Sequence, residues 1–524
     1  MAASKVVSQA CGECRARKIK CDLQRPACGR CIKSRRRCPG YRDQLTLLFK
    51  DETQSVAQRT KATTHTIAIG RRTPKSIMEE ALGKALLSND RAQRGELFLP
   101  PMDLFVVDVQ DRASCYFFEV FDWVGASTLV DGSFNHATDA VKAPVGERAL
   151  LAGISAVGKA SLANVEQNIC LKESAMNDYV ATLKLVKMAV DDAEQLENDS
   201  TLTAIFLLSL FEMVVGQGTE SFENWLNHIE GAARLIEMRG KDELSCAASR
   251  TMFYAWRPQM IVCSLIRKAP VPSKLLSFSF QYASFTRRPD TASTRELTFI
   301  IARLARLGHN IDTANMTDSE AILSELGSID AALTAWSNSI SPSCYYDPVL
   351  TTESFQMGYS FTLTPHRRYS HKYPGIWVAS MWNQYRTTRL QVYGMILAHL
   401  QPQAAAGRPA CEPHRVQCAE IRSRMCRLAN DICCSVPYIL GLLGQDRRES
   451  PSTPIKSSMG GFMLLWPLTV AALADQHPSA TSSFVLHCFD IIRWALGIHQ
   501  AMVFRDCVLS STTLYGWADA YDVF

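Results

Sequence analysis

The sequence predicts a mainly α-helical protein in three parts: a small cysteine-rich head, a polar linker and a large all-α body. Three observations carry this prediction. Six cysteines lie at regular spacing near the N-terminus, residues from about 51 to 101 are polar and mixed in charge, and the residues beyond 101 show repeated helical periodicity with few strand signals. We therefore expect a head at 1–42, a linker at 43–100 and one helical domain at 101–524.

The head is defined by the cysteine spacing C-x2-C-x6-C-x6-C-x2-C-x6-C. This pattern has two equal halves, so the chain is expected to fold back and bring two triplets of thiolates together. Two four-coordinate zinc ions need eight ligand positions, and six sulfurs supply eight only if two of them each bridge both ions. The spacing therefore predicts a binuclear zinc cluster with the ligands Cys11, Cys14, Cys21, Cys28, Cys31 and Cys38.

Other uses of six cysteines fit the chain less well. A disulfide scaffold is typical of small secreted domains, whereas this chain has 524 residues and no apolar signal segment after Met1. Iron–sulfur ligation usually shows a run of four cysteines, and a mononuclear zinc finger would leave two cysteines unused. Zinc is the metal that we expect.

Basic residues crowd the cysteines and make the head strongly positive. Residues 1–50 carry a net charge of +10, whereas the rest of the chain carries −5. A compact basic surface attracts phosphate and gains affinity from counterion release, without reading sequence. We expect the partner to be a nucleic acid, and the candidate contacts are Arg15, Arg17, Lys18, Lys20, Lys33, Arg35, Arg36 and Arg37.

The segment 11–38 resembles the zinc binuclear cluster of fungal Zn2Cys6 transcription factors. The six cysteines, the basic run from Arg15 to Lys20, Asp22 and Pro26 carry this resemblance. It implies that the first and fourth cysteines bridge the two ions. The bridging residues would be Cys11 and Cys28, with Cys14 and Cys21 completing one site and Cys31 and Cys38 the other.

The resemblance also implies that the partner is double-stranded DNA, and it implies a mode of recognition. A short helix after the first cysteine pair would enter the major groove, where Arg17 and Lys18 meet a CGG-type triplet. Of these two residues Lys18 is the stronger candidate for base edges, because a basic side chain can donate to guanine O6 and N7. The remaining basic residues are expected to contact phosphates and to set orientation.

The stretch after the head leaves the oligomeric state open. Leu45, Leu48, Phe49 and Val56 lie at helical spacing, which amounts to one or two heptads. A convincing coiled coil needs about three or four. A short helix that packs on the cluster and a weak homodimer or heterodimer both remain compatible with this pattern.

The linker carries two features of its own. A short helix is expected at 76–87, inside an otherwise Thr-rich and basic stretch. The basic runs at 33–37 and 71–75 could serve nuclear import, which favours the nucleus as the location.

Helical periodicity runs through the body. Apolar residues 202–215 suit a buried core helix, and this stretch and 461–474 are too short or too interrupted to span a bilayer, so no membrane is expected. A capping box at Thr317-x-x-Glu320 would begin the next apolar series, and Ser221 would cap the helix that carries Trp225. The apolar series after Glu320 consists of Ile322, Leu326, Ile329, Leu333, Trp336 and Ile340.

The body resembles the large fungal-specific regulatory domain that accompanies such clusters. The stretch 225–240 carries the resemblance, and weaker echoes lie at 382–386, 466–468 and 497–501. The resemblance implies control of activity and contact with the transcription machinery or co-regulators. It also suggests that the targets are genes of metabolism or small-molecule production.

Candidates for an enzyme site or a second metal site are weak. Gly153 to Lys159 matches a phosphate-binding loop, but Ala160 stands where Ser or Thr should hold magnesium, and the preceding residues are predicted to be helical. Cys411, His414 and Cys418 flank a proline, and free cysteines are good core residues in a reducing compartment. His228 also fits helix packing. We therefore expect no enzyme.

These observations favour a nuclear, sequence-specific DNA-binding transcription factor of the RNA polymerase II type. Two rivals stay open. One is a repressor or a non-activating partner of another cluster protein, which would share every feature above. The other is an enzyme with a zinc-dependent DNA tether, although the sequence offers no catalytic constellation for it.

Overall fold

The computed structural model describes residues 10–39 apart from 18, 23, 25–27, 35 and 37, and then 109–121, 143–216, 218–238, 247–282, 290–357, 361–405, 412–443, 458–474 and 479–510. The chain divides into two compact units, Met1–Arg112 and Ala113–Phe524. The linker at 43–100, with the helix expected at 76–87, the heptads at 45–56 and the basic run at 71–75, lies outside the described residues.

The described residues of the head form two one-turn helices, α1 (Gly12–Ala16) and α2 (Gly29–Lys33). Each helix begins directly after the first cysteine of one half of the repeat and contains the second. The repeated sequence spacing thus becomes a repeated local structure.

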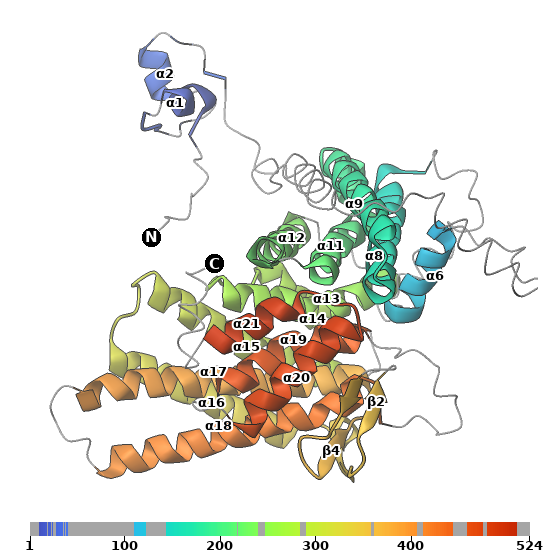
Figure 1. Cartoon of the computed structure of the whole chain (residues 1–524). Helices are drawn as coiled ribbons and strands as arrows, with labels where there is room; N and C mark the ends of the chain where they lie inside the picture. The colour runs from blue at the N-terminus through green and yellow to red at the C-terminus, as the bar shows by residue number, and fades with distance from the viewer. Residues whose placement is uncertain are drawn as a thin grey trace, which may run out of the picture. The chain divides into compact units, whose positions relative to one another are not determined.

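The described residues of the second unit are mostly helical, in agreement with the predicted class (Figure 1). Its first helices are α6 (Val109–Phe121), α8 (Val145–Glu166), α9 (Ile169–Val190), α10 (Ala193–Leu196), α11 (Asp199–Val215), α12 (Gly218–Met238), α13 (Ala247–Ile266) and α14 (Ser273–Tyr282). They are followed by α15 (Asp290–Asp312), α16 (Ser319–Ser339), α17 (Ile376–Ala405), α18 (Glu412–Ile439), α19 (Ser458–Leu473), α20 (Ala480–Trp494) and α21 (Ala501–Ser510).

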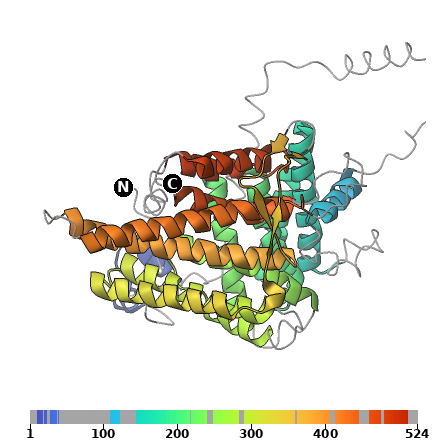
Figure 2. The ribbon, with the colours of Figure 1, turned by 90° about the horizontal axis from the view of Figure 1, so that it is seen from below.

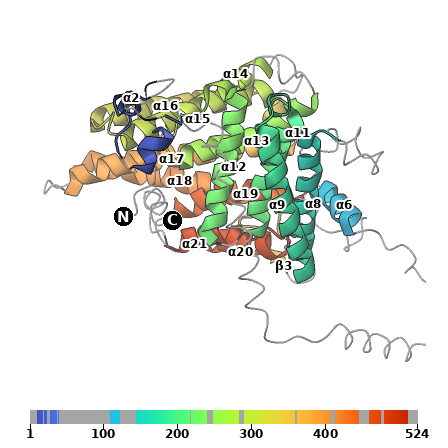
Figure 3. The same ribbon diagram turned by 90° about the horizontal axis from the view of Figure 1, so that it is seen from above.

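Helix α11 forms the centre of the first helical group. Residues 200–215 are buried along the whole helix, which packs against α8, α9 and α12. This confirms the core helix predicted from the apolar run 202–215. Figure 3 shows α8, α9, α11 and α12 running side by side.

The segment that matched a phosphate-binding loop lies inside helix α8. Gly153 lies close to Leu207 of α11, and a Cβ at Gly158 would lie 2.2 Å from the backbone oxygen of Ala113. Lys159 is buried and donates to Asp178 of α9 at 2.7 Å. The small residues therefore serve helix packing, and the lysine is held by a carboxylate.

The second helical group runs across the first. Helices α17 and α18 are long neighbours that pack side by side, and α15 and α16 lie against α17 (Figure 2). Helix α19 is buried at nearly every position and packs against α17, α18, α20 and α21. None of the described helices is both long enough and apolar enough to cross a membrane.

Among the described residues of the body, four short strands interrupt the helices. Strand β1 (Asp347–Leu350) pairs antiparallel with β4 (Tyr369–Lys372), and β2 (Phe355–Met357) pairs antiparallel with β3 (Phe361–Leu363). The inner pair thus lies between the strands of the outer pair in sequence. Strands of three or four residues are too short to give a clear alternation in the sequence.

Two helix starts differ from their predicted positions. The carboxylate of Asp318, one residue after Thr317, accepts from the backbone N–H of Glu320 at 3.1 Å and caps α16. Ser221 lies inside α12 and is buried, because that helix already begins at Gly218. The apolar series from Ile322 to Ile340 is buried, as predicted.

Candidate metal centre and nucleic-acid interface

The two short helices of the head bring the cysteines together. Cys11 directly precedes α1 and Cys14 lies within it. Cys28 is the N-cap of α2, and its sulfur accepts from the backbone N–H of Cys31 at 3.3 Å. The backbone N–H of Cys11 lies 3.5 Å from the sulfur of Cys21, which links the first triplet internally.

The sulfur atoms are spaced as zinc ligands require. The Sγ atom of Cys28 lies 3.6 Å from those of both Cys11 and Cys14, and the Sγ atoms of Cys11 and Cys31 are 3.8 Å apart. A tetrahedron with Zn–S bonds of about 2.3 Å has edges of about 3.8 Å, whereas a disulfide would bring two sulfurs to about 2.05 Å. The donor set therefore fits zinc.

The thiols form two overlapping groups of four. Within each group all ligand atoms lie within 4.8 Å of one another, and Cys11 and Cys28 belong to both groups. The first group is completed by Cys14 and Cys21, and the second by Cys31 and Cys38. Six thiols thus supply two four-membered sets, which is what a binuclear cluster needs.

The protein surroundings alone favour neutral thiols at this centre. Cys11, Cys14, Cys28 and Cys31 are buried, while Cys21 and Cys38 are partly exposed. Burial and the neighbouring thiols raise the pKa of Cys14 to about 12, and burial also raises the pKa of Cys31. A bound zinc ion reverses this preference because it deprotonates a coordinating thiol outright. Metal binding and thiolate formation are therefore coupled.

Asp22 connects the two halves of the head. Its carboxylate accepts from the backbone N–H of Gly29 at 3.1 Å, and Gly29 is the first residue of α2. Asp22 directly follows Cys21 of the first triplet in the sequence. This hydrogen bond therefore fixes α2 relative to the first triplet without using a metal ligand.

Several of the predicted DNA contacts are exposed in the described part of the head. Arg17, Lys20, Lys33 and Arg36 all have exposed side chains, as does Arg30, which was not among the predicted contacts. Lys18, Arg35, Arg37 and the side chain of Arg15 lie outside the described residues.

An acidic neighbour of Arg17 was missed by the sequence reasoning. The Nε atom of Arg17 donates to the carboxylate of Glu13 at 2.6 Å. The two residues are four apart on α1, a spacing that places them on one face of a helix and that the sequence already contains. Arg17 must give up or share this carboxylate to contact DNA.

Outside the head, the other sequence candidates do not gather into a metal site. Among the residues that the structure describes, groups of three or more potential metal ligands occur only in the head. Cys411 and the side chain of His414 lie outside the described residues. His228 lies 3.1 Å from the hydroxyl of Tyr179, which itself donates to Glu212 at 2.6 Å, and burial lowers the pKa of His228 to about 4. A neutral, hydrogen-bonded core histidine explains these contacts.

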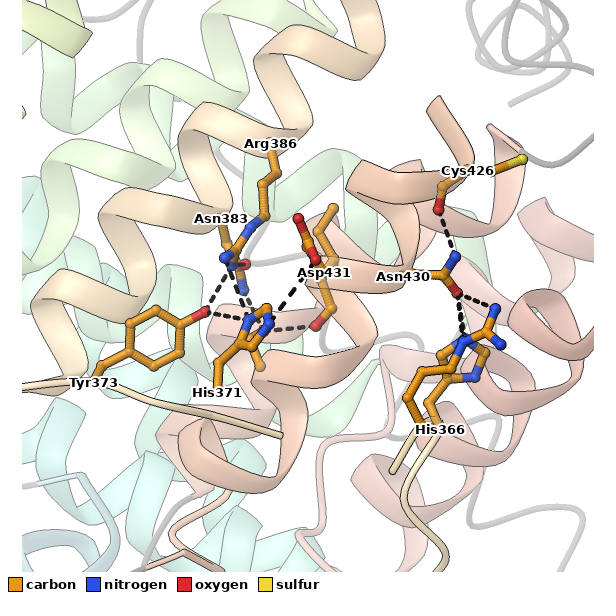
Figure 4. Close-up of polar contacts among 11 residues, drawn as sticks. His366, His371, Tyr373, Asn383, Arg386, Cys426, Asn430 and Asp431 are labelled. Atoms are coloured by element: carbon orange, nitrogen blue, oxygen red, sulfur yellow. Dashed lines mark hydrogen bonds and ion pairs between the residues drawn. The ribbon is translucent and has the colours of Figure 1, made fainter. Parts of the chain in front are cut away.

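A buried polar cluster in the body surrounds Arg386 of α17 (Figure 4). The guanidinium donates from Nη1 to the hydroxyl of Tyr373 at 2.7 Å and to Oδ1 of Asn383 at 2.9 Å, and Nη2 lies 3.4 Å from Nδ1 of His371. The rings of Tyr346, Tyr373 and Trp382 lie within 6 Å of its Cζ atom. No carboxylate of the described chain accepts a hydrogen bond from this arginine. Aromatic rings and neutral acceptors contact its charge directly, and the carboxylate of Asp431 attracts it through space.

The same cluster joins three elements. His371 belongs to β4, Arg386 and Asn383 to α17, and Asp431 of α18 lies 3.9 Å from Nε2 of His371. Burial, with Arg386 as a second cause, lowers the pKa of His371 to about 3. The stretch 382–386 was noticed in the sequence only as an echo of a regulatory domain. Apart from Asn383, the partners of Arg386 lie on other elements, so helical periodicity could not reveal them.

Comparison with known families agrees with this geometry. Residues 9–47 match the fungal Zn(2)-Cys(6) binuclear cluster domain, and residues 134–345 match the fungal specific transcription factor domain. The second match includes the stretch 225–240 and ends before 382–386. No curated protein and no solved structure gives a match.

The head is thus a zinc-binding DNA-binding domain, and the class of protein is a transcription regulator. Together the two domains are those of a fungal transcription factor that uses a zinc binuclear cluster.

Proposed function

We propose that this chain is a nuclear, sequence-specific transcription factor of the RNA polymerase II type, whose zinc cluster reads CGG-like triplets in the major groove. The observation that carries the proposal is the pair of four-thiol groups that share Cys11 and Cys28 beneath a strongly basic surface. In this proposal Cys11 and Cys28 bridge the two zinc ions and the other four cysteines each bind one.

The roles of the basic residues follow from their positions in the sequence. Lys18 is assigned to the base edges with help from Arg17, since these residues follow directly on α1. Arg15, Lys20, Lys33, Arg35, Arg36 and Arg37 are assigned to phosphates, which fix orientation but carry no sequence information. The net charge of +10 on residues 1–50 supports strong, salt-dependent affinity.

The remaining parts are assigned by the same proposal. Residues 1–42 bind DNA, 43–100 link, and 101–524 regulate through contacts with the transcription machinery or co-regulators. One triplet alone gives little sequence specificity, so the proposal includes a homodimer or heterodimer that reads two half-sites. The family resemblance favours a metabolic or small-molecule biosynthetic gene set as the target, and repression in place of activation would use the same head.

Two substitutions separate base reading from phosphate contact. The full chain, Lys18→Ala and Arg36→Ala are titrated in gel-shift assays onto duplexes that carry CGG or a scrambled triplet, at several salt concentrations. We expect Lys18→Ala to lose about 1–3 kcal/mol of discrimination between the two duplexes. Arg36→Ala should weaken binding to both duplexes alike and reduce the salt slope by about one. Equal, uniform losses in both variants would contradict this division of roles.

Zinc removal tests the proposal independently of the triplet. A chelator should abolish DNA binding by the full chain, while the helical circular dichroism signal of the body persists, because the candidate metal ligands lie in the head. Restoring zinc should restore binding. DNA binding that survives complete zinc removal would rule out the cluster as the reading device.

A further inference from the structure

Three exposed apolar side chains lie where the end of α8 and the start of α9 meet the end of α20. Val165 of α8 is 45% exposed, Ile169 of α9 is 54% exposed and Trp494 of α20 is 46% exposed. The chain after α20 lies against α8, since a Cβ at Gly497 would lie 3.5 Å from Cγ2 of Val165 and the carbonyl of Gly497 accepts from Asn164 at 2.8 Å. Exposed apolar side chains that lie together are typical of an interaction surface.

Two basic side chains lie beside these apolar ones. The Cζ atom of Arg493 lies 4.4 Å from the centroid of the Trp494 ring, and the charge of Arg493 also acts on Lys172 of α9. Neither Lys172 nor Arg493 forms an ion pair with a carboxylate in the part of the chain that the structure describes. We call this surface the α9–α20 patch, which consists of Val165, Ile169, Lys172, Arg493 and Trp494.

The positive charges of the patch repel one another. Burial, with Arg493 as the second cause, lowers the pKa of Lys172. The ring of His499 lies 6.2 Å from that of Trp494, and burial together with the charges of Arg493 and Lys172 lowers the pKa of His499 to about 4. Like charges at a half-buried site disfavour each other, whereas a negative charge placed beside them favours their charged forms. The patch therefore suits an acidic partner that also carries apolar side chains.

Residues 511–524 have this composition. They contain Asp519 and Asp522 and no Lys or Arg, which gives a net charge of −2. They follow directly on α21 and lie outside the described residues. An acidic and aromatic segment is complementary to a basic and apolar surface. The aromatic residues of this segment are Tyr515, Trp517, Tyr521 and Phe524.

This segment is long enough to reach the patch. Helix α21 begins two residues after His499, and its ten residues span about 15 Å. The nine residues from Ser510 to Asp519 can extend over about 30 Å. A tethered segment has an effective concentration of about millimolar, so contacts too weak to hold two separate molecules together are sufficient.

We propose that residues 511–524 bind the α9–α20 patch of their own chain. Asp519 and Asp522 lie near Lys172 and Arg493, and the aromatic side chains cover Trp494. A protein that binds either the patch or the segment competes with this contact and shifts its population. The contact does not depend on DNA reading by the head, because both of its sides belong to the body.

Chymotrypsin cleavage after Tyr515 measures whether the segment is bound. The zinc-loaded full chain and a synthetic peptide of residues 509–524 are digested under the same conditions, and mass spectrometry follows the loss of residues 516–524. The protease cuts the unbound segment, so we expect the full chain to be cut at least about tenfold more slowly than the peptide.

Charge reversal locates the contact on the body. In the patch variant, Lys172→Glu with Arg493→Glu, cleavage should be at least about threefold faster than in the wild type, because the patch then repels the segment. The matched control is Lys184→Glu with Arg306→Glu, which reverses the same two charge types at exposed positions of α9 and α15 outside the patch. This control should be cut as slowly as the wild type.

Charge reversal in the segment is the reciprocal test. Asp519→Lys with Asp522→Lys should also speed cleavage relative to a peptide with the same changes. Combined with the patch variant it should restore the protection, which shows that the two sets of charges act on each other. If the patch variant fails to fold, the segment variant decides, since its changes lie outside the described body.

Three outcomes would overturn the proposal. The first is a full chain that is cut as fast as the peptide, and the second is unchanged protection in the charge-reversed variants. The third is protection that grows with protein concentration, which would show binding to a second copy of the chain. DNA is absent from this experiment, so its result is independent of the gel-shift result for the head.

Discussion

The sulfur atoms of Cys11 and Cys28 lie 3.6 Å apart, and each belongs to both four-thiol groups of the head. The other four cysteines belong to one group each. An experiment can therefore distinguish the two shared cysteines from the four unshared ones, although all six follow one sequence pattern.

Substitution of a shared cysteine should lower the zinc content more than substitution of an unshared cysteine. In Cys28→Ser neither group retains four thiols, so we expect the zinc content to fall from two ions per chain to below one. In Cys38→Ser the group of Cys11, Cys14, Cys21 and Cys28 stays complete, so about one ion should remain. Zinc released from the purified protein into a chromogenic chelator measures both. Cys170→Ser, at an exposed position of α9, is the control, and equal losses in the two head variants would contradict bridging.

Neutralising Glu13 should strengthen DNA binding. Glu13→Gln removes the carboxylate that holds Arg17 and also removes a negative charge from the basic face, so one more cation is available to phosphate or base. The slope of log affinity against log salt should steepen by about 0.9. Glu194→Gln, an exposed acid in the body, should leave the slope unchanged. A slope that stays the same in Glu13→Gln would show that Arg17 makes no contact with DNA.

Removal of the buried guanidinium should destabilise the body. Arg386→Met leaves the hydroxyl of Tyr373 and the amide of Asn383 without their shared partner, and we expect the free energy of unfolding to fall by about 3 kcal/mol. Arg386→Lys should recover little, because a lysine cannot reproduce the planar set of donors. Denaturant melts measure the change. Arg234→Met, at an exposed i,i+4 pair with Glu230, should alter stability by less than about 0.5 kcal/mol.

Protonation of His371 should destabilise the body in mild acid. Its pKa is lowered to about 3 in the folded protein, against 6.5 in the unfolded chain, so the unfolded state binds the proton first as pH falls. This contribution is fully present above pH 6.5 and is lost below it, at up to about 1.4 kcal/mol per pH unit. In His371→Gln this part of the pH dependence should be absent, so the stability difference from wild type shrinks between pH 6.5 and 5.

Denaturant melts at several pH values test this prediction. Parallel stability curves for the wild type and His371→Gln would contradict the assignment to His371.

Local features of this chain could be predicted from the sequence. The burial of α11 and the apolar series from Ile322 to Ile340 follow from helical periodicity, which needs only neighbours within two turns. The presence of two overlapping thiol groups follows from six cysteines spaced within 28 residues, whereas Cys11 and Cys28 were expected to be the shared pair only from the family resemblance. One local prediction, the N-cap of α16, was wrong. Thr317 and Asp318 are adjacent and both are good N-cap residues, and only the folded backbone selects one.

Features that depend on distant contacts could not be predicted. The cluster at Arg386 combines strand β4 with helices α17 and α18, and it leaves no period in the sequence. The short strands β1 to β4 were missed for a related reason, since three or four residues carry too little alternation to stand out between two long helices.

Two features connect the chain before Asp22 with the chain after Cys28. They are the hydrogen bond from Gly29 to Asp22 and the two shared cysteines. Each four-thiol group takes ligands from both sides of the loop between Asp22 and Cys28, so each zinc ion would act as a cross-link across that loop. A cut in the loop of the zinc-loaded head would then leave two fragments that stay associated and separate only when the metal is withdrawn.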